Sequence, residues 1–204
     1  IELSTKPDVG MNMWMAGKTD RTLFTTMSPV ARTTTHGSAP REISELPVPM
    51  VLVRQLGEAW TRPFVAIFEP FNETDGQAIS NVRTLKSEGD FIGLIVESDR
   101  LNRRTETIFN DTSMDNIHTV EGQTFHGIYG ITSADANGLQ YLYLGHGKIL
   151  SAHGFEITAT SQPVSACLYR ENNELRISAS GPVQIKTPER SHTVEACHAH
   201  LLIP

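Results

Sequence analysis

Residues 50–71 read MVLVRQLGEAWTRPFVAIFEPF and contain two short apolar runs, at 50–53 and 64–68. Neither run alternates apolar with polar residues, as a strand with one solvent-facing side would, so both faces of each run are predicted to be buried. Their shortness, their β-branched and aromatic residues, and the flanking Pro49 and Pro70 favour strands over helices. We therefore expect the two runs to pair as a hairpin in the middle of a sheet.

The composition is that of a globular protein. The 204 residues suffice for one large β domain or two small ones, and 39% of them are hydrophobic. The net charge of −6 argues against nucleic acid or an anionic membrane as the main partner. We find no apolar run of about 18 residues and no charged-then-apolar leader, so neither a transmembrane helix nor a signal peptide is expected. The first residue, Ile1, suggests a mature form or a piece of a longer protein.

No stretch has sustained helical periodicity, which predicts an all-β fold of antiparallel β-sandwich type with two stacked β-sheet units. Residues 10–28 have a hairpin pattern, and residues 29–49 read as a long polar loop. A change in strand character near Glu88 predicts the closing part of a central sandwich at 1–87 and a small C-terminal sandwich domain at 88–204. In the second part we expect strands near 91–96, 105–109, 124–132, 139–144, 149–151, 155–159, 166–170, 175–178, 183–186 and 194–202.

The clearest hairpin of this second part spans residues 167–178, because Asn172 and Asn173 tolerate the positive φ of a tight turn. Cys167 begins this hairpin, and Cys197 lies 30 residues later. The two cysteines could form a disulfide in an oxidising compartment or remain as buried thiols, and both alternatives stay open.

One motif has the spacing of metal ligands. In Cys197-His198-Ala199-His200, alternate residues of a strand would place His198 and His200 on the same face, as in strand-borne sites of cupin-like metal proteins. A complete site needs a third ligand, for which the candidates are His146, His153, His192 and Glu195. The alternative, which we favour, is an exposed terminal strand with polar side chains.

Other side chains are candidates for contact with a sugar. Arg103 and Arg104, with Arg100, form a basic cluster whose guanidinium groups would suit the carboxylates or sulfates of an acidic sugar chain. Trp14 and Trp60, with Tyr129, Tyr141 and Tyr143, could include a stacking platform, although core packing explains most of them. His146 lies between two glycines in an expected turn, where it is either a base or a solvated residue. We find no Gly-x-Ser-x-Gly, Ser-x-x-Lys or Cys-x-x-Cys motif.

The order of several segments resembles the C-terminal β region of heparinase II/III-like polysaccharide lyases. MNMWMAG, RTLFTTMSP and VPMVLVRQLGEAWTRPFVAIFEP are similar to the closing β region of these enzymes. FIGLIVESDR, QTFHGIYGI, LYLGHGKIL and FEITA resemble their small C-terminal β-sandwich domain. The resemblance is moderately specific, since it rests on strand patterns with Trp14, Trp60 and Gly-His-Gly rather than on a reactive signature.

The resemblance implies a parent protein with an N-terminal α-helical toroid, which cleaves acidic polysaccharide by β-elimination with Tyr and His as base and acid. No part of this chain could form the toroid, so we assign it no catalytic residue and no cofactor, and expect no activity from the chain alone. It would be a non-catalytic module of a secreted or periplasmic lyase. Trp60, Arg103, Arg104 and His146 are its candidate sugar contacts. The alternatives are an independent carbohydrate-binding module and a cupin-like metal protein that uses His198 and His200.

Overall fold

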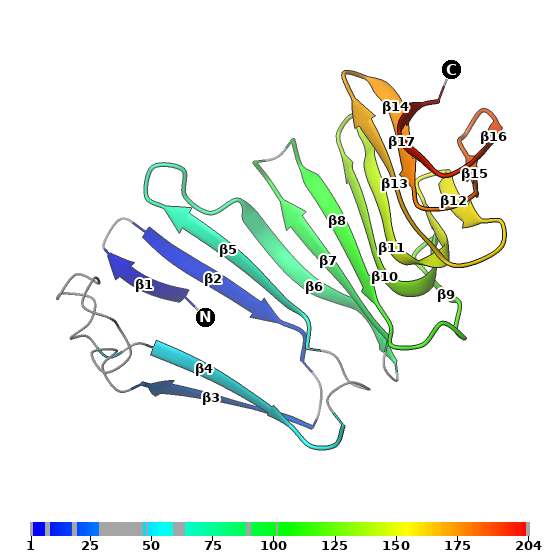
Figure 1. Ribbon diagram of the computed structural model, residues 1–204. Helices are drawn as coiled ribbons and strands as arrows, with labels where there is room; N and C mark the ends of the chain where they lie inside the picture. The colour runs from blue at the N-terminus through cyan, green and yellow to red at the C-terminus, as the bar shows by residue number, and fades with distance from the viewer. Residues whose placement is uncertain are drawn as a thin grey trace, which may run out of the picture.

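The computed structural model describes residues 2–6, 9–17, 20–28, 47, 49–58, 64–88, 91–100 and 102–202. This part of the chain is built from antiparallel strands and contains no helix, which confirms the predicted all-β fold (Figure 1). The strands are β1 (Glu2–Lys6), β2 (Val9–Met15), β3 (Arg21–Met27), β4 (Pro49–Gln55), β5 (Ala66–Asn72), β6 (Ile79–Glu88), β7 (Phe91–Ser98), β8 (Arg104–Asn110), β9 (His118–Val120), β10 (Gln123–Asp135), β11 (Gly138–Ala152), β12 (Phe155–Ala159), β13 (Val164–Glu171), β14 (Glu174–Ala179), β15 (Val183–Lys186), β16 (Ser191–Val194) and β17 (Cys197–Leu201).

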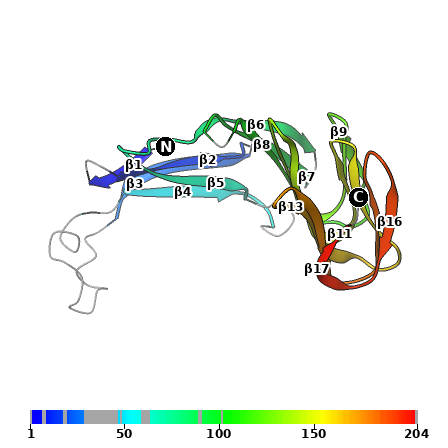
Figure 2. The same cartoon turned by 90° about the horizontal axis from the view of Figure 1, so that it is seen from above.

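The described strands form three sheets. β1, β2 and β5 form one, β3 and β4 form a second, and the other twelve strands form the third. In this large sheet β6, β7, β8, β10 and β11 follow one another, and β11 then pairs with both β12 and β13. Figure 2 shows β1 to β5 extending to one side of the molecule, away from the strands that close the other end.

The hairpin of β10 and β11 bends the large sheet into a sandwich. The first part of β11 pairs with β13 through residues 141–147, and its last part pairs with β12 through residues 149–152. Register shifts interrupt the β10–β11 ladder at the bend, where a Cβ on Gly147 would lie 2.6 Å from the carbonyl oxygen of His126. Because the two backbones cross so closely, the corner requires glycine.

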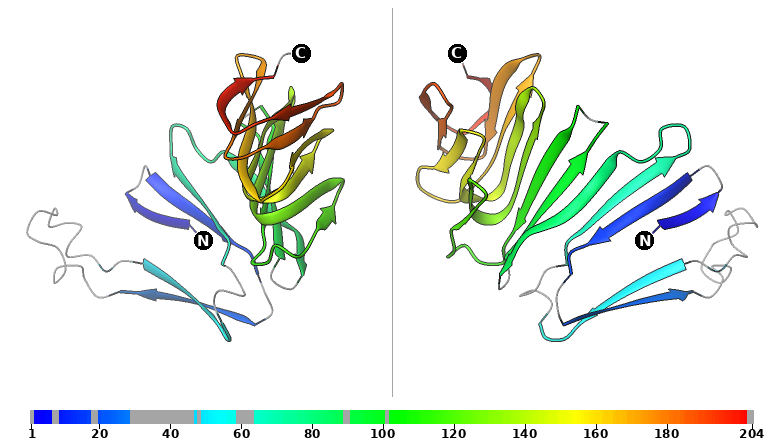
Figure 3. Two further views of the ribbon diagram at one scale, coloured as in Figure 1. Left: turned by 45° about the vertical axis from the view of Figure 1, so that its right-hand side comes forward. Right: turned by 180° about the vertical axis from the view of Figure 1, so that it is seen from behind.

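The core lies between the two branches of this bent sheet. One branch, β13 and β14, contributes Leu168 and Ile177, and the other, β12 and β15, contributes Ile157 and Ile185; all four are fully buried. The two branches face each other in Figure 3, as the layers of a β-sandwich do.

A strand buried on both faces is found at β7, next to the edge strand β6 of the large sheet, and not in the predicted hairpin at 50–71. Six consecutive residues of β7, 91–96, are buried, so this strand is covered on both faces. The 50–53 run lies in β4 and pairs with β3, while 64–68 leads into β5, which pairs with β2. Leu52 is 47% exposed and Phe68 59% exposed. The predicted pairing and burial of this stretch are therefore wrong, because an apolar run does not specify which strand or layer covers it.

Two other hairpin predictions have different outcomes. Residues 10–28 do not form a hairpin, because β2 and β3 belong to different sheets. The hairpin at 167–178 is confirmed: β13 pairs with β14, and Asn172 and Asn173 have φ values of 53° and 67°. The predicted strands 139–144 and 149–151 are the two halves of β11, and the predicted strand 194–202 is divided into β16 and β17.

Both cysteines are free thiols in the structure. The division predicted between residues 87 and 88 stays a prediction; β6 and β7, which flank it, pair along their length. In the described part of the chain, no helix is long and apolar enough to cross a membrane.

Candidate carbohydrate-binding surface

All four tyrosines of the chain lie on one face of the large sheet. Ser133 of β10 is opposite Tyr141 of β11, which is opposite Tyr169 of β13. Directly paired residues of a sheet point to the same side, and so do residues two apart along a strand. Tyr143 therefore shares this side, and so does Tyr129, four residues before Ser133 in β10. We call this side the tyrosine face; the opposite side of the sheet packs into the core.

A carboxylate anchors the middle of the tyrosine face. Glu106 of β8 lies opposite Ser133, and its Oε1 accepts a hydrogen bond of 2.9 Å from the Tyr141 hydroxyl and one of 3.3 Å from Ser133 Oγ. Ser133 is fully buried, whereas Tyr141 and Glu106 are part-exposed. The carboxylate thus fixes the orientation of the Tyr141 ring, so that the ring is positioned before any ligand binds.

Two tyrosines of this face, Tyr141 and Tyr129, have a raised pKa. Burial, together with the nearby Glu106 carboxylate, raises the pKa of Tyr141 well above its ordinary value. Burial, Tyr143 and Glu106 raise the pKa of Tyr129 in the same direction. A tyrosine that abstracts a proton needs a lowered pKa, so these two side chains are suited to donate hydrogen bonds and to stack, and not to act as bases.

The rings of Tyr129 and Tyr143 pack edge to face, with centroids 6.1 Å apart and an interplanar angle of 68°. Gly145 provides the space for this arrangement, because a Cβ at that position would lie 3.1 Å from Cδ1 of Tyr129. All four tyrosines are only partly buried. An ordered, part-exposed set of aromatic rings offers apolar surfaces to the C–H face of a sugar, together with hydroxyl groups for its polar edge.

Two arginines lie on the tyrosine face. Arg104 precedes Glu106 by two residues in β8, and its charge acts on Tyr141. Its Nε is buried and has no hydrogen-bond partner among the residues that the structure describes. Arg176 pairs with Tyr169 across β13 and β14 and forms ion pairs of 2.9 Å with Glu171 and Glu174. Arg104 is thus the less neutralised of the two cations.

The predicted sugar contacts are only partly brought together. Trp60 lies outside the described residues. Arg103 is exposed in the turn before β8, with a φ of 56°, beside Arg104 on the tyrosine face. His146 is exposed and opposite Tyr129 in the register; it lies inside β11 and not in the predicted turn. The roles of these residues in sugar binding stay predictions.

The predicted metal pair lies at an irregular position. His198 and His200 are exposed on β17, but Ala199 between them has a φ of 49°, and the β14–β17 register shifts there. The regular alternation on which the prediction rested is therefore broken at this strand. Within the described residues, no group of three or more His, Cys, Asp or Glu side chains could hold a metal ion.

Sequence reasoning missed Tyr169, Glu106 and Ser133 on this surface. The alternation in residues 166–170 was visible and would have placed Tyr169 opposite the core residue Leu168. The contact of Glu106 with Tyr141 crosses two strand pairings, which local patterns do not reveal.

Sequence reasoning also missed a buried pair outside the tyrosine face. His118 Nε2 lies 2.5 Å from Oδ2 of Asp111, whose side chain is 2% exposed, and the His118 ring stacks on Phe91 with centroids 3.8 Å apart. Asp111 also accepts a hydrogen bond from the backbone N–H of Ser113. With one side covered by Phe91, the pair fixes the connection between β8 and β9 and is not a site open to a ligand.

Comparison with known proteins supports the resemblance at the level of a polysaccharide-lyase C-terminal domain. Residues 79–169 match the family described as the endo-acting ulvan lyase C-terminal domain. The chain is also 28% identical over 159 residues to an endo-acting ulvan lyase of Formosa agariphila, in an alignment that covers 74% of this chain and 19% of that enzyme. The chain therefore spans about a fifth of the length of this relative. No solved structure matches the chain.

The matched segment begins at the first residue of β6 and includes Glu106 and all four tyrosines. The tyrosine face thus lies within the part of the chain that resembles the ulvan lyase domain. Both matches are to ulvan lyases, and neither is specifically to the heparinase II/III-like family.

Proposed function

We propose that this chain is the non-catalytic C-terminal module of a larger lyase that cleaves an acidic polysaccharide, and that its tyrosine face helps to hold that polysaccharide. The observation that carries the proposal is the gathering of four part-exposed tyrosines and Arg104 on one sheet face, inside the segment that matches ulvan lyase C-terminal domains. Ulvan is accordingly the first polymer to test.

The raised pKa values of Tyr129 and Tyr141 support a binding role over a catalytic one. The β-elimination chemistry and the N-terminal α-helical toroid that the heparinase II/III resemblance implies belong, in this proposal, to the rest of the parent protein. Because a polysaccharide is too large to enter a cell intact, we propose a secreted or periplasmic location for that parent.

The first five strands support membership in a larger protein. Among the described residues from 9 to 68, ten large apolar side chains are more than a third exposed, including Phe24 at 48% and Leu52 at 47%. Phe24 and Leu52 are direct partners in the two-stranded sheet of β3 and β4. Such a sheet is marginal by itself, and apolar patches of this kind mark interfaces. We propose that another part of the parent lyase covers this surface.

An independent carbohydrate-binding module is the alternative, since it would use the same tyrosine face. The exposed apolar side chains of β3 and β4 favour the module of a larger protein, because a free-standing domain would leave this surface in water.

The test is a binding and turnover assay of the 204-residue chain with ulvan, alginate, chondroitin and heparan. We expect binding to at least one of these polymers and no rise in the absorbance of unsaturated uronate. Tyr143→Ala and Arg104→Ala should each weaken binding about tenfold, the effect of losing a stacked ring or a charged contact. Arg83→Ala is the matched control. Val82 of β6 aligns through Val96 with Glu106 on the tyrosine face, so the next residue, Arg83, points to the opposite side of the sheet.

Each outcome decides one part of the proposal. Turnover by the isolated chain would overturn the non-catalytic role. The binding role would be overturned if the chain bound none of the four polymers, or if the unmodified chain and both tyrosine-face variants bound equally. Thermal unfolding of each variant shows whether a loss of binding reflects a loss of fold.

A further inference from the structure

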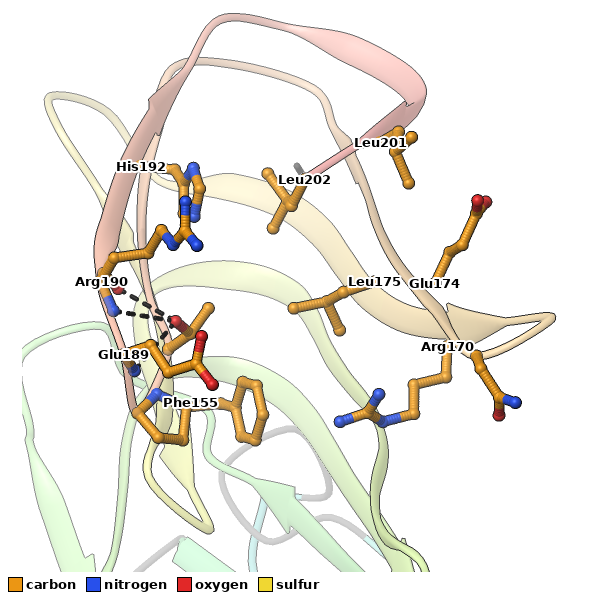
Figure 4. Close-up of a pocket in the computed structure, with 12 residues that line it drawn as sticks. Phe155, Arg170, Glu174, Leu175, Glu189, Arg190, His192, Leu201 and Leu202 are labelled. Atoms are coloured by element: carbon orange, nitrogen blue, oxygen red, sulfur yellow. Dashed lines mark hydrogen bonds between the residues drawn. The ribbon is translucent and has the colours of Figure 1, made fainter. Parts of the chain in front are cut away.

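A hollow lies at the open end of the sandwich, on the other side of the sheet from the tyrosine face. It is a cavity of about 380 Å³ between the β13–β14 hairpin and the β15–β16 turn (Figure 4). Phe155, Leu175 and Leu202 form its apolar part. Small-molecule sites have volumes of about 300–1,000 Å³, so this cavity has room for one sugar ring.

Polar side chains occupy inward positions on both walls of this cavity. Arg170 pairs with Leu175, directly above the buried pair of Leu168 and Ile177 and on the same side of the sheet. On the facing wall, His192 pairs with the buried Ile185. The alternation of both strands would place apolar residues at the positions of Arg170 and His192 to close the core. Arg170 is exposed and His192 part-exposed at this end of the sandwich, so both side chains are accessible to a ligand that enters the cavity.

Arg170 Nε donates a hydrogen bond of 2.9 Å to the carbonyl oxygen of Leu139, which orients the side chain. Among the residues that the structure describes, no hydrogen bond of its terminal nitrogens is found, so these can donate to a ligand. Arg190 extends into the cavity from the opposite wall, as Figure 4 shows. Its turn is fixed by Thr187, whose Oγ1 accepts hydrogen bonds from the backbone N–H groups of Glu189 and Arg190 at 3.4 Å and 3.2 Å. The two arginines thus line the cavity from opposite walls, with Phe155 and Leu175 between them (Figure 4).

The cavity walls also contain Glu174 and Glu189. Glu174 is already paired with Arg176 at 2.9 Å, so Glu189 is the carboxylate left to offset the two arginines, and the cavity keeps an excess of positive charge. Carboxylates accept hydrogen bonds from sugar hydroxyls, guanidinium groups bind a carboxylate or sulfate, and the apolar floor contacts C–H groups. This combination fits a sugar ring that carries a single anionic group.

A polar recess of about 440 Å³ adjoins the cavity and shares Arg170 and Asn173 with it. Its other lining residues are Asn137, Gln140 and Asn172, so side-chain amides dominate. Amide groups both donate and accept hydrogen bonds, as the hydroxyls of a sugar require. The recess therefore offers polar groups to a second sugar that is linked to the one in the cavity.

We propose that the open end of the sandwich binds an acidic sugar unit, with its carboxylate or sulfate between Arg170 and Arg190 and its neighbouring sugar in the amide-lined recess. This site is separate from the tyrosine face and does not depend on the role proposed for that face.

The test is a titration of the 204-residue chain, followed by NMR, with methyl β-glucuronide, glucose 6-sulfate and the neutral methyl β-glucoside. We expect saturable binding of at least one acidic sugar, with shifts at His192 and Arg190, and at least tenfold weaker binding of the neutral one. Arg190→Ala should weaken acidic-sugar binding about tenfold, and Arg190→Lys should restore part of it. Arg83→Ala should bind as the unmodified chain does, because Arg83 is not among the residues that line the cavity.

The carboxylate and sulfate probes distinguish the two possible anions, and binding of either supports the site. Three results would each overturn it: no saturable binding of either acidic sugar, equal binding of the neutral sugar, or unchanged binding by a folded Arg190→Ala variant. Since the tyrosine face is tested by polymer binding and by Tyr143→Ala, failure of one site does not imply failure of the other.

Discussion

The hydroxyl of Tyr141 donates a 2.9 Å hydrogen bond to Glu106, two strands away in the large sheet, and Ser133 on the intervening strand donates to the same carboxylate oxygen. Tyr141→Phe removes the stronger of these donors and leaves the ring in place. Because hydrogen bonds to charged groups contribute about 1.5–3 kcal/mol and Glu106 is part-exposed, we expect a loss of about 1–2 kcal/mol in the free energy of unfolding.

Urea unfolding at pH 7 measures this loss. Tyr169→Phe is the matched control, since no hydrogen bond of the Tyr169 hydroxyl is found within the described residues, and we expect it to change stability by less than about 0.5 kcal/mol. Equal losses in the two variants would show that the contact with Glu106 does not stabilise the sheet.

The part-buried side chains of Tyr129, Tyr141 and Cys167 make the fold sensitive to alkali. Burial raises the pKa of Tyr141, Tyr129 and Cys167 above ordinary values of 10.0 for tyrosine and 9.0 for cysteine. Above those values the unfolded chain releases protons that the folded chain retains, so the unfolded state binds fewer protons and stability falls as pH rises. The stabilisation is fully present below about pH 9 and declines above it.

The free energy of unfolding, measured at intervals from pH 7 to pH 11, should therefore fall beyond about pH 9. Tyr141→Phe should fall less steeply above about pH 10, because one of the groups that release a proton on unfolding is gone. Parallel curves for the two proteins would contradict the raised pKa of Tyr141.

The corner between β10 and β11 depends on Gly147. A Cβ at this position would lie 2.6 Å from His126 O and 2.8 Å from Cα of Gly127, both backbone atoms that cannot rotate away. Gly147→Ala should destabilise the fold by about 2–3 kcal/mol, as overpacking does in a closely packed region. Gly17→Ala is the control, because a Cβ on Gly17 meets no atom within 4 Å. Thermal or urea unfolding that shows equal stability for both variants would contradict the role assigned to the corner.

The pair of Asp111 and His118 should contribute more to stability than any surface ion pair. His118→Ala leaves the Asp111 carboxylate buried with the Ser113 N–H and removes the ring that covers Phe91. Breaking such a pair destabilises proteins by about 3–5 kcal/mol, and we expect a loss in this range. His200→Ala is the control because His200 is exposed. A loss in His118→Ala no larger than the control's would show that the pair is not needed to hold β8 and β9 together.

The fold class could be predicted from the sequence because period-2 patterns recur through β8 to β15 and no helical pattern competes with them. The run at 91–96 was recognised as a strand, yet burial on both faces was predicted for 50–53 and 64–68 instead. An apolar run predicts that a strand is buried, but it does not identify the residues or the protein that bury it. β7 is covered within this chain, whereas Leu52 of β4 and Phe68 of β5 are exposed.

The candidate sites were less predictable for the same reason. Tyr129, Tyr141 and Tyr143 were visible as a possible platform, but their placement on one face depends on the register of β10 and β11. The cavity at the end of the sandwich requires that Arg170 and His192, 22 residues apart, face each other from different layers. The bend at Gly147 brings these two layers together, and no local sequence pattern predicts that bend.

Substitution in the exposed pair of Phe24 and Leu52 tests whether another part of the parent lyase covers β3 and β4. Leu52→Lys removes an apolar side chain that is 47% exposed in this chain, so we expect its free energy of unfolding to change by less than about 0.5 kcal/mol. Binding of the dye anilinonaphthalene sulfonate should fall, because an apolar patch on β3 and β4 is interrupted. Leu94→Lys, at a site that is 2% exposed, should instead unfold the chain. If Leu52→Lys unfolded the chain as well, β4 would already be buried in solution and would need no partner. If Leu52→Lys left this chain stable but destabilised the full parent lyase, β4 would lie in the interface between this module and the rest of that lyase.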